Sequence, residues 1–261
     1  MLRTLRPGYW ADVIRRNKYE RRRRRFDSYE IQRSFDGADY RMWISDPVAK
    51  KWYDTPTMGN AQELVFTRER MVAPGDVVFD CGCHQGLTTL LFSHWVGSTG
   101  KVIAFEALPD NFTVLRKNLE LNSAANVEPV HAAVGASQGS VALDVRPNAN
   151  VSTGNFGLQV PMVCLDQYAD RTPNLLKIDV EGFEAEVLKG AQRVLATHPK
   201  IILELHTRSL PDFGTSVDEI LGLLNLQRYK TWIQADSEAE PVAYRGEPIE
   251  TRVHLFMLPI E

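Results

Sequence analysis

The sequence predicts an α/β fold: a doubly wound, mostly parallel sheet of seven strands with helices on both faces. Short apolar runs alternate with longer amphipathic segments over most of the chain. Several of these runs are apolar throughout, as expected of strands that are covered on both faces. Strand–helix–strand repetition of this length is typical of parallel sheets with crossover helices. We expect an N-terminal helical and aromatic extension and an inserted β pair to complete the fold.

Residues 1–60 should form the extension, because they are rich in arginine and aromatic residues and lack the strand–helix alternation. We expect a helix over Ala11–Arg25. Its arginine run, Arg21–Arg25, is interpreted as a solvated face, with contact to nucleic acid or anionic lipid as the alternative. Residues 36–60 should hold a short strand and then an irregular loop. This segment carries Tyr40, Trp43, Trp52 and Tyr53. Trp43 and Trp52 are expected in the core of the extension, and a cap over the substrate is the alternative.

Residues 61–261 should form the main domain. It begins with a helix over Ala61–Val72, which Pro74 and Gly75 stop. The strands are expected at Val77–Asp80, Val102–Glu106, Val127–Val134, Leu175–Val180, Ile201–His206, Tyr229–Ile233 and Val253–Leu258. The helices between them are expected at Leu87–Trp95, Asn111–Asn122, Phe183–Leu195 and Ser216–Leu226. Two further runs, Ser140–Val145 and Val160–Leu165, interrupt the alternation and predict the inserted antiparallel pair.

The stretch VVFDCGCHQG marks the end of the first strand of the sheet. Ligands of such sheets bind at the C-terminal ends of the strands. Asp80 ends this strand, and Gly82 and Gly86 allow a ligand to approach the backbone closely. The next strand ends at Glu106, an acid suited to the two hydroxyls of a ribose. Asp80 would repel a pyrophosphate but suits the ammonium and sulfonium groups of S-adenosylmethionine, so the pattern favours that cofactor over NAD.

The same stretch could also bind a metal, because Cys81, Cys83 and His84 are soft ligands. A structural zinc site needs a fourth ligand and usually a C-x₂₋₄-C spacing, and no partner pair follows in the sequence. A redox C-x-x-C pair is absent. Small buried thiols are therefore the preferred interpretation of the cysteines.

Three segments together resemble the FkbM family of S-adenosylmethionine-dependent methyltransferases. They are FTRERMVAPGDVVFDCGCHQGLTTLLFSHWVGSTGKVIAFEALPDNFTVLRKNLELN, LLKIDVEGFEAEVLKGA and IILELH, and the most specific element is LLKIDVEGFE. The resemblance implies a class I, Rossmann-like methyltransferase fold and, usually, methylation of a hydroxyl on a sugar or natural product. It places Asp179 in the acidic motif of the fourth strand. Cys83 and His84 stand where the family is expected to have Ala-Asn.

The expected cofactor site combines these motifs with the end of the third strand, where the adenine should meet backbone at Ala132. Its residues are Asp80, Gly82, Cys83, His84, Gly86, Glu106, Ala132 and Asp179.

Three residues are expected beside this site as the catalytic group: Asp179, Glu204 and His206. Glu204 and His206 share one face of their strand because strand side chains alternate. The three residues could bind Mg²⁺ or another divalent cation that acidifies an acceptor hydroxyl. Alternatively, His206 is a general base that a carboxylate orients. A structural role in holding loop backbone also stays open. Lys177 is expected to pair with the acids from below, and an exposed position at the edge is the alternative.

Other ionisable residues are assigned no chemistry. Glu184 and Glu186 are expected to be solvated helix charges. His94, His131 and His198 are expected at the surface or at the edge of the core.

Composition limits the partners. A net charge of −3 and a pI near 6.1 argue against a general nucleic-acid binder. No window is long and apolar enough for a transmembrane helix, no secretory signal is evident, and the three cysteines form no disulfide framework. We therefore expect a cytoplasmic enzyme, monomeric or homo-oligomeric, with a hydroxylated small-molecule acceptor.

Other functions compete with this one. An N-methyltransferase or nucleic-acid methyltransferase would share the fold, but the fourth strand lacks an Asn/Asp-Pro-Pro-aromatic signature. A non-catalytic module that binds the cofactor is a further alternative. An NAD-dependent oxidoreductase is disfavoured by Asp80 and by the glycine spacing.

Overall fold

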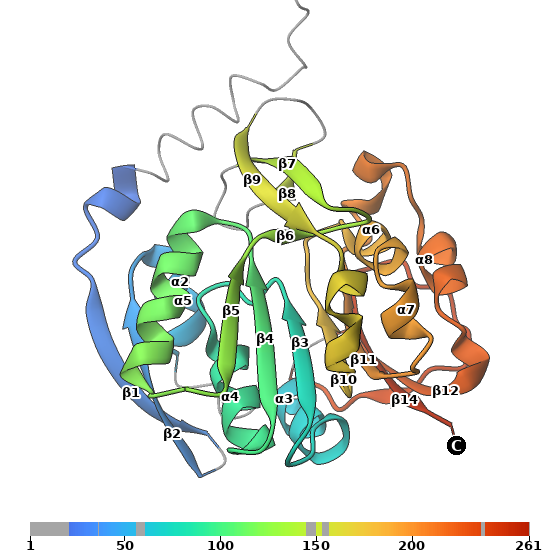
Figure 1. The fold of residues 1–261 in the computed structure, drawn as a ribbon, viewed down its shortest axis with the longest axis horizontal. Helices are drawn as coiled ribbons and strands as arrows, with labels where there is room; N and C mark the ends of the chain where they lie inside the picture. The colour runs from blue at the N-terminus through green and yellow to red at the C-terminus, as the bar shows by residue number, and fades with distance from the viewer. Residues whose placement is uncertain are drawn as a thin grey trace, which may run out of the picture.

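The computed structural model describes residues 21–35, 37–55, 61–144, 150–152, 157–235 and 238–260. Within these ranges the chain folds around one large sheet, whose strand order is β13-β12-β14-β11-β10-β3-β4-β5 (Figure 1). The helix expected over Ala11–Arg25 lies outside the described residues except at its end, where residues 21–24 are helical. No helix in the described ranges has the length and apolarity that a membrane span needs.

All seven expected strands are present in the central sheet. Its strands are β3 (Val77–Cys81), β4 (Lys101–Glu106), β5 (Val127–His131), β10 (Leu175–Ile178), β11 (Lys200–Leu205), β12 (Tyr229–Gln234), β13 (Val242–Ala243) and β14 (Val253–Pro259). The strands from β5 across to β11 run parallel, whereas β14 and β12 are antiparallel to their neighbours. The two-residue β13 adds an edge strand that was not expected. The mostly parallel sheet is therefore confirmed.

Helices cover both faces of the sheet (Figure 1). One face carries α4 (Leu87–Val96) and α5 (Pro109–Leu121), and the other carries α6 (Glu184–Lys189), α7 (Gln192–Leu195) and α8 (Val217–Leu223). The single helix expected over Phe183–Leu195 is thus two helices. Successive residues of β3 show the two layers: Val78 packs in one cluster with Phe92 of α4, and Phe79 packs in another with Val187 of α6. The doubly wound arrangement is also confirmed.

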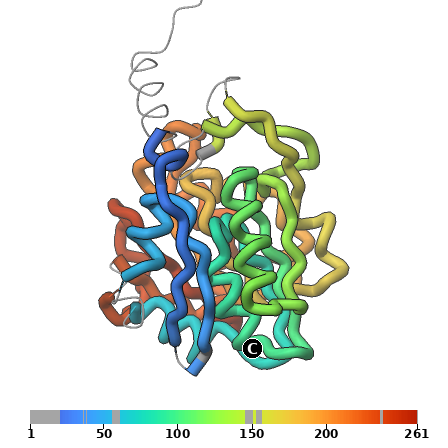
Figure 2. Tube along the Cα trace, turned by 90° about the vertical axis from the view of Figure 1, so that its left-hand side faces the viewer, coloured from blue at the N-terminus to red at the C-terminus, as the bar shows by residue number. Residues whose placement is uncertain are grey.

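The N-terminal extension is more regular than expected. It forms a hairpin of β1 (Tyr29–Phe35) and β2 (Ala38–Ile44), and helix α2 (Pro47–Tyr53) replaces the irregular loop. Asp46 caps this helix, because its Oδ1 accepts hydrogen bonds from the backbone N–H groups of Val48 and Ala49. Figure 2 shows the hairpin along one flank of the molecule. There it packs against α4 and α5 in a shared apolar cluster.

A second helical segment leads from the extension into the sheet. It consists of α3 (Gln62–Phe66) and a π-helical turn over Thr67–Met71, in place of the regular helix expected over Ala61–Val72. Three 3₁₀ turns, at Leu165–Arg171, Leu210–Phe213 and Leu226–Arg228, complete the helical structure of the described residues.

The inserted antiparallel pair is present as β7 (Gly139–Asp144) and β9 (Leu158–Val163). Two short strands extend it to four. β6 (Ala133–Val134) is the end of the expected third strand, and β8 (Asn150–Val151) pairs with β7. This small sheet lies beyond the C-terminal ends of β3, β4 and β5 (Figure 1). It therefore stands at the edge where the sequence predicts the ligand site.

Candidate active site

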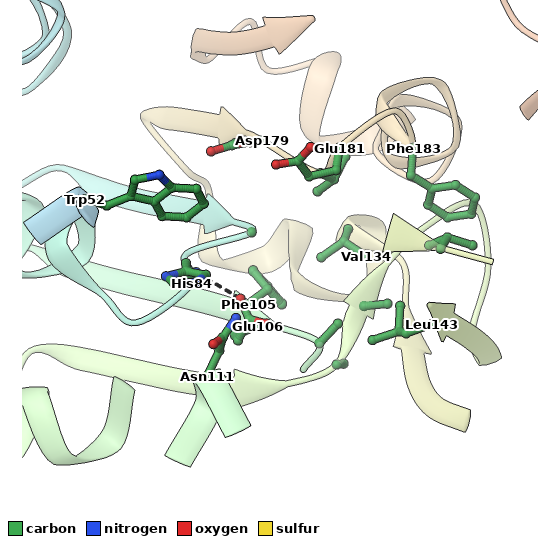
Figure 3. A pocket seen from close by; sticks show the side chains of 16 residues that line it. Trp52, His84, Phe105, Glu106, Asn111, Val134, Leu143, Asp179, Glu181 and Phe183 are labelled. Atoms are coloured by element: carbon green, nitrogen blue, oxygen red, sulfur yellow. Dashed lines mark hydrogen bonds between the residues drawn. The ribbon is translucent and has the colours of Figure 1, made fainter. Parts of the chain in front are cut away.

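A cavity of about 120 Å³ that opens to solvent lies at the C-terminal ends of β3, β4 and β10 (Figure 3). One part of its wall is polar and includes His84, Glu106, Asn111, Asp179 and Glu181. The apolar part includes Val134, Leu143, Val151 and Phe183, and Phe105 lies beside Glu106 (Figure 3). The small inserted sheet contributes to the apolar part through β6, β7 and β8. The cavity therefore offers charge at one end and an apolar slot at the other.

Two glycines shape the loop between β3 and α4. Gly82 lines the cavity with a φ of +81°, and a Cβ atom there would lie 1.8 Å from the carbonyl oxygen of Asp179. Gly86 begins α4 with a φ of +92°, and a Cβ there would lie 2.4 Å from a methyl group of Leu115. Only glycine tolerates both the positive φ and the missing space. The expected close approach is therefore made by the protein's own backbone and by α5.

Glu106 is a buried acid that faces the cavity (Figure 3). Its Oε2 accepts a hydrogen bond from the backbone N–H of His84 at 2.9 Å, and its Oε1 accepts one from Leu108 at 2.7 Å. Burial raises the pKa of Glu106 to about 7, against the opposing effect of these hydrogen bonds. The side chain of Asn111 also hydrogen-bonds this carboxylate, and because each oxygen has two lone-pair directions the group retains acceptor capacity for a ligand.

Asp80 lies below the cavity and is not part of its wall. Its Oδ2 accepts a hydrogen bond from Thr89 at 2.7 Å, and its Oδ1 lies 3.4 Å from Nζ of Lys177. Lys177 also lies 3.4 Å from Asp179, so it pairs with both acids from below, as the sequence predicts. Burial would lower the pKa of Lys177, but the two aspartates raise it. Asp80 is therefore connected to the cavity wall through Lys177, which also pairs with Asp179.

Asp179, Glu204 and His206 come together at the ends of β10 and β11, as expected. The imidazole Nε2 of His206 lies 3.9 Å from Asp179, 3.4 Å from Glu204 and 3.5 Å from Glu181. Asp179 and Glu181 line the cavity, whereas His206 and Glu204 lie behind them. Glu181 was not among the candidates, although the expected turn after the fourth strand could have indicated it.

Burial and neighbouring charges shift the pKa values of these three groups in different directions. Burial and the neighbouring Glu204 raise the pKa of Asp179 to about 7. Burial would lower the pKa of His206, but its hydrogen bond to Glu184 and the surrounding carboxylates raise it to about 9. Burial would raise the pKa of Glu204, but the hydrogen bond from His254 lowers it. At neutral pH, therefore, His206 is a cation behind a rim of acids.

The expectation that Glu184 is a solvated helix charge is wrong. Its side chain is fully buried, and its Oε1 lies 2.8 Å from Nδ1 of His206 and accepts a hydrogen bond from the backbone N–H of Gly182 at 2.9 Å. The sequence carried a signal for this, because the apolar residues Val187 and Leu188 follow at helical spacing and are buried with it. Glu186 points away and pairs with Lys189, as expected.

A divalent cation would meet a different ligand set from the expected one. Among the described residues, the ligand atoms of Asp179, Glu181 and His206 all lie within 4.8 Å of one another. Glu204 was expected in this set, but its Oε1 lies 3.1 Å from Arg252 and its Oε2 lies 3.1 Å from His254. Glu181 takes its place in the set because Glu204 is turned toward β14.

The cysteines and His84 form no metal clip. Cys81 and Cys83 are buried in separate apolar clusters, because the positive φ of Gly82 interrupts the strand alternation between them. Burial raises the pKa of both thiols. His84 lines the cavity, where its Nδ1 shares a hydrogen bond with the hydroxyl of Tyr53 and its ring lies 5.0 Å from that of Trp52. Burial lowers the pKa of His84 to about 4, which keeps the ring neutral.

The aromatic residues of the extension have different positions: Trp43, expected in its core, is half-buried with the ammonium of Lys117 over its ring, and the others lie in the core or at the cavity. Tyr40 and Tyr53 are buried in the apolar cluster of the extension. Trp52 packs at the edge of that cluster and also lines the cavity, to the left of Asp179 in Figure 3.

Ala132, expected beside the adenine, lies at the end of the expected third strand. Ala132 lines the cavity and is buried. His131 precedes it and stacks on Phe112 of α5 at 4.8 Å, so its ring belongs to the edge of the core.

Comparison with known proteins places this geometry in a family. Residues 80–231 match the methyltransferase FkbM domain. The hexuronic acid methyltransferase AglP of Haloferax volcanii is 30% identical over 166 residues, which cover 60% of this chain and 65% of that protein. Methyltransferase 1 of Beauveria bassiana is 26% identical over 144 residues, 43% of this chain and 57% of that protein. The chain thus spans less than two thirds of the length of either relative.

A solved structure supports the fold. The crystal structure of methyltransferase FkbM from Methylobacillus flagellatus KT aligns with 76% of this chain and 48% of its own, with a TM-score of 0.52 and 18% sequence identity. At this identity the similarity shows the shared fold.

Proposed function

The chain belongs to the FkbM methyltransferase family, and from this premise we propose that it transfers a methyl group from S-adenosylmethionine to a hydroxyl of a sugar or a related polyhydroxylated small molecule. One observation carries the proposal. A single cavity joins a buried acid at the end of β4, Glu106, with two acids at the end of β10, Asp179 and Glu181. The first suits a ribose diol, and the other two suit a cationic sulfonium and the acceptor beside it.

The cavity fits the cofactor in three respects. Glu106 is held by backbone hydrogen bonds from His84 and Leu108 and by the side chain of Asn111, and its carboxylate retains acceptor capacity toward the cavity. Gly82 lines the cavity between Glu106 and Asp179, where its bare backbone can face the amino-acid portion of the cofactor. The apolar slot near Ala132 and Leu143 suits an adenine ring.

A sugar acceptor has two lines of support. The family relative AglP is named a hexuronic acid methyltransferase. In this chain, Trp52 presents an aromatic ring to the same cavity as Asp179 and Glu181 (Figure 3). Sugar rings commonly bind with one face on an aromatic side chain and with their hydroxyls on carboxylates. The substrate-cap role of the extension is therefore proposed for Trp52.

The chain's own residues would prepare the acceptor. S-adenosylmethionine, when bound, would supply a methyl group on a sulfonium, which an acceptor oxygen aligned with the carbon–sulfur bond could receive. Asp179 is placed to receive the hydroxyl proton, because it lines the cavity and its pKa of about 7 suits a base near neutral pH. His206 lies behind it as a cation, so it supports this carboxylate and does not itself accept the proton. A cation held by Asp179, Glu181 and His206 would be the alternative means of acidifying the hydroxyl.

Binding and transfer measurements test the proposal. Calorimetry should detect S-adenosylhomocysteine binding to the full chain and no comparable binding of NAD. Tritium from labelled S-adenosylmethionine should then appear in a panel of glycans that includes hexuronic acids, and not in RNA. Binding of NAD but not of S-adenosylhomocysteine would overturn the proposal. Binding of S-adenosylhomocysteine with no methyl transfer to any acceptor would favour the non-catalytic module. EDTA chelation followed by Mg²⁺ readdition distinguishes the two means of activating the hydroxyl. Transfer that is lost with EDTA and restored by Mg²⁺ would favour the bound cation, and transfer that is unaffected by EDTA would favour Asp179 as the base.

Asp179→Asn tests the assignment of the base. We expect the transfer rate to fall by about 10²–10⁴-fold, while S-adenosylhomocysteine still binds. Asp170→Asn is the matched control, because Asp170 is an exposed acid that pairs with Arg193. Full activity in Asp179→Asn would show that another group receives the proton.

A further inference from the structure

His84 is an imidazole at the cavity wall whose backbone and ring have different partners. Its φ is +51°, a left-handed conformation that residues other than glycine rarely adopt. In this conformation its backbone N–H donates to Glu106, while its ring lines the cavity. Glycine would adopt the same φ with less strain and would keep the backbone hydrogen bond. The contact with Glu106 therefore does not account for the imidazole.

Tyr53, at the end of α2 in the extension, determines which nitrogen of this ring carries the proton. Burial lowers the pKa of His84 to about 4, so the ring is neutral and has one N–H. The hydroxyl of Tyr53 shares a hydrogen bond with Nδ1, and a hydrogen bond from the backbone of Gln85 reaches the same hydroxyl. This hydroxyl is buried, so its own proton needs an acceptor, and Nδ1 is the acceptor that the described residues offer. The proton of the ring is therefore on Nε2.

The N–H at Nε2 is available to a ligand. Within the part of the chain that the structure describes, His84 forms hydrogen bonds through Nδ1 and through its backbone N–H, and Nε2 forms none. The ring of Trp52 lies 5.0 Å from that of His84 and limits its rotation. The ring is thus held by two residues of α2, with a donor of fixed direction left over.

The amino-acid portion of the proposed cofactor would reach this donor. Figure 3 shows Val134 and Leu143 on one side of Glu106, and His84 and Trp52 on the other. With the adenine in the apolar slot and the ribose on Glu106, the rest of the cofactor extends toward His84. Its terminal ammonium and carboxylate therefore lie at this end of the cavity.

The carboxylate needs hydrogen-bond donors, and this wall offers few. The described residues that line the cavity include no lysine or arginine. Their side-chain donors are Trp52, His84 and Asn111, and Asn111 is already bonded to Glu106. A donor that is held in one direction before the ligand arrives binds at a lower entropic cost. His84 meets this condition because Tyr53 fixes its proton.

We propose that Nε2–H of His84 donates to the carboxylate of S-adenosylmethionine, and that Tyr53 is a positioning residue that fixes this donor. The inference deepens the proposed function and rests on it. It gives the N-terminal extension a part in cofactor binding, because α2 carries Tyr53 at its end. At the start of the same helix, Asp46 accepts a hydrogen bond from Gln85, the residue after His84, at 2.8 Å.

Calorimetry of the full chain with two ligands isolates the carboxylate. S-Adenosylhomocysteine carries it, whereas 5′-S-(3-aminopropyl)-5′-thioadenosine has the same chain and amine without it. In His84→Ala the affinity for S-adenosylhomocysteine should fall by about 10–100-fold, because a hydrogen bond to a charged group is lost. The affinity for the aminopropyl ligand should stay within about twofold, since the backbone hydrogen bond to Glu106 remains.

Tyr53→Phe tests the positioning role. It keeps the packing of the ring and removes the hydroxyl, so the affinity for S-adenosylhomocysteine should fall by about 2–10-fold and that for the aminopropyl ligand should not change. NMR with ¹⁵N-labelled histidine should show His84 protonated at Nε2 in the unmodified protein and as a mixture of tautomers in Tyr53→Phe. Tyr40→Phe is the matched control, since Tyr40 is buried in the same apolar cluster and forms no hydrogen bond with His84. It should change neither the affinities nor the tautomer.

The outcomes separate the inference from the function on which it rests. Failure of the unmodified protein to bind S-adenosylhomocysteine would overturn the proposed function. Normal binding with an equal affinity for the aminopropyl ligand, or an equal loss for both ligands in His84→Ala, would overturn the role of His84. Loss of the discrimination in Trp52→Phe but not in His84→Ala would assign the carboxylate to the indole instead. A proton on Nδ1 in the unmodified protein would overturn the role of Tyr53, even if the variants do not fold.

Discussion

At Gly82 the chain has no room for a side chain, and this local fact fixes the floor of the cavity. The loop after β3 passes so close to the end of β10 that a Cβ atom would overlap the carbonyl oxygen of Asp179. The backbone N–H groups of Gly82 and Cys83 both donate to the carbonyl of Phe105, which ties the same loop to β4. A single residue therefore sets the spacing between three neighbouring strand ends.

Gly82→Ala should destabilise the protein by about 2–4 kcal/mol, because the new Cβ has to displace backbone atoms as well as adopt a positive φ. Chemical denaturation measures this change in the free energy of unfolding. Gly97→Ala is the matched control, since Gly97 also has a positive φ, +66°, but has no atom within 4 Å of its Cβ position. The control should cost about 1 kcal/mol. Equal costs for the two variants would show that the close approach to Asp179 is not rigid.

Glu106 should make cofactor binding depend on pH. Its pKa is raised to about 7 in the free protein, and only the ionised form offers both oxygens as acceptors to a ribose diol. Bound hydroxyls stabilise that form, so the affinity for S-adenosylhomocysteine should rise as the pH increases from 6 to 8. Calorimetry at several pH values measures this. In Glu106→Gln the affinity should fall by about 10–100-fold and lose most of its pH dependence. An unchanged slope in the variant would assign the titration to another group.

At the scale of single elements, α2 connects the extension to the site. Asp46 caps the helix through Oδ1, and its Oδ2 accepts a hydrogen bond from Gln85 in the loop that leads into α4. Trp52 and Tyr53, at the end of the helix, contact His84 at the cavity wall. The cap therefore stabilises α2 and also holds that helix against the loop between β3 and α4.

Asp46→Ala should lower the free energy of unfolding by about 1–2 kcal/mol through the lost cap, and should also weaken S-adenosylhomocysteine binding because His84 loses its fixed neighbours. Ser216→Ala removes the N-cap of α8, which is remote from the cavity and forms a capping box with Glu219. It should cost about 1 kcal/mol with no effect on binding. Thermal melts compare the stability of the two variants, and calorimetry compares their affinity for S-adenosylhomocysteine. Equal affinity in the two would show that α2 does not support the site.

The elements differ in how well the sequence predicts them. The main sheet was predicted strand by strand because its residues form continuous apolar runs, and the resemblance of its motifs to the FkbM family is confirmed by the family match. Helix α2 was missed because its aromatic residues masked the Asp46-Pro47 start signal. Glu184 was misplaced because charge was given more weight than its position in the apolar stripe of α6. Glu181 was missed because it lies in the turn after the fourth strand, and the expected turn was not examined for a carboxylate that reaches the ligand site.

At the scale of the whole molecule, ionisable groups concentrate under one end of the sheet. Lys177, Glu204, His206 and His254 are all buried there, together with Asp80 and Glu184. Such a network stabilises the fold only while its charges balance. The site and the stability of the molecule are therefore coupled through pH.

The sign of this coupling follows from the two histidines. The pKa values of His206 and His254 are both raised to about 9, because nearby carboxylates outweigh burial. A group with a raised pKa stabilises the fold fully below its unfolded value, near 6.5, and this contribution is lost as the pH rises through the folded value. The free energy of unfolding should therefore fall between pH 6.5 and 9.5, by an amount on the order of 2 kcal/mol for each histidine.

Urea denaturation at a series of pH values measures that slope. His254→Gln should flatten it by about half, since the variant removes one of the two titrating groups and leaves an amide to face Glu204. His94→Gln is the matched control, because His94 is exposed near the end of α4 and should leave the slope unchanged. A stability that stays level to pH 9.5 in the unmodified protein would mean that the buried carboxylates do not hold these histidines as cations. The base assigned to Asp179 would then lose its supporting charge.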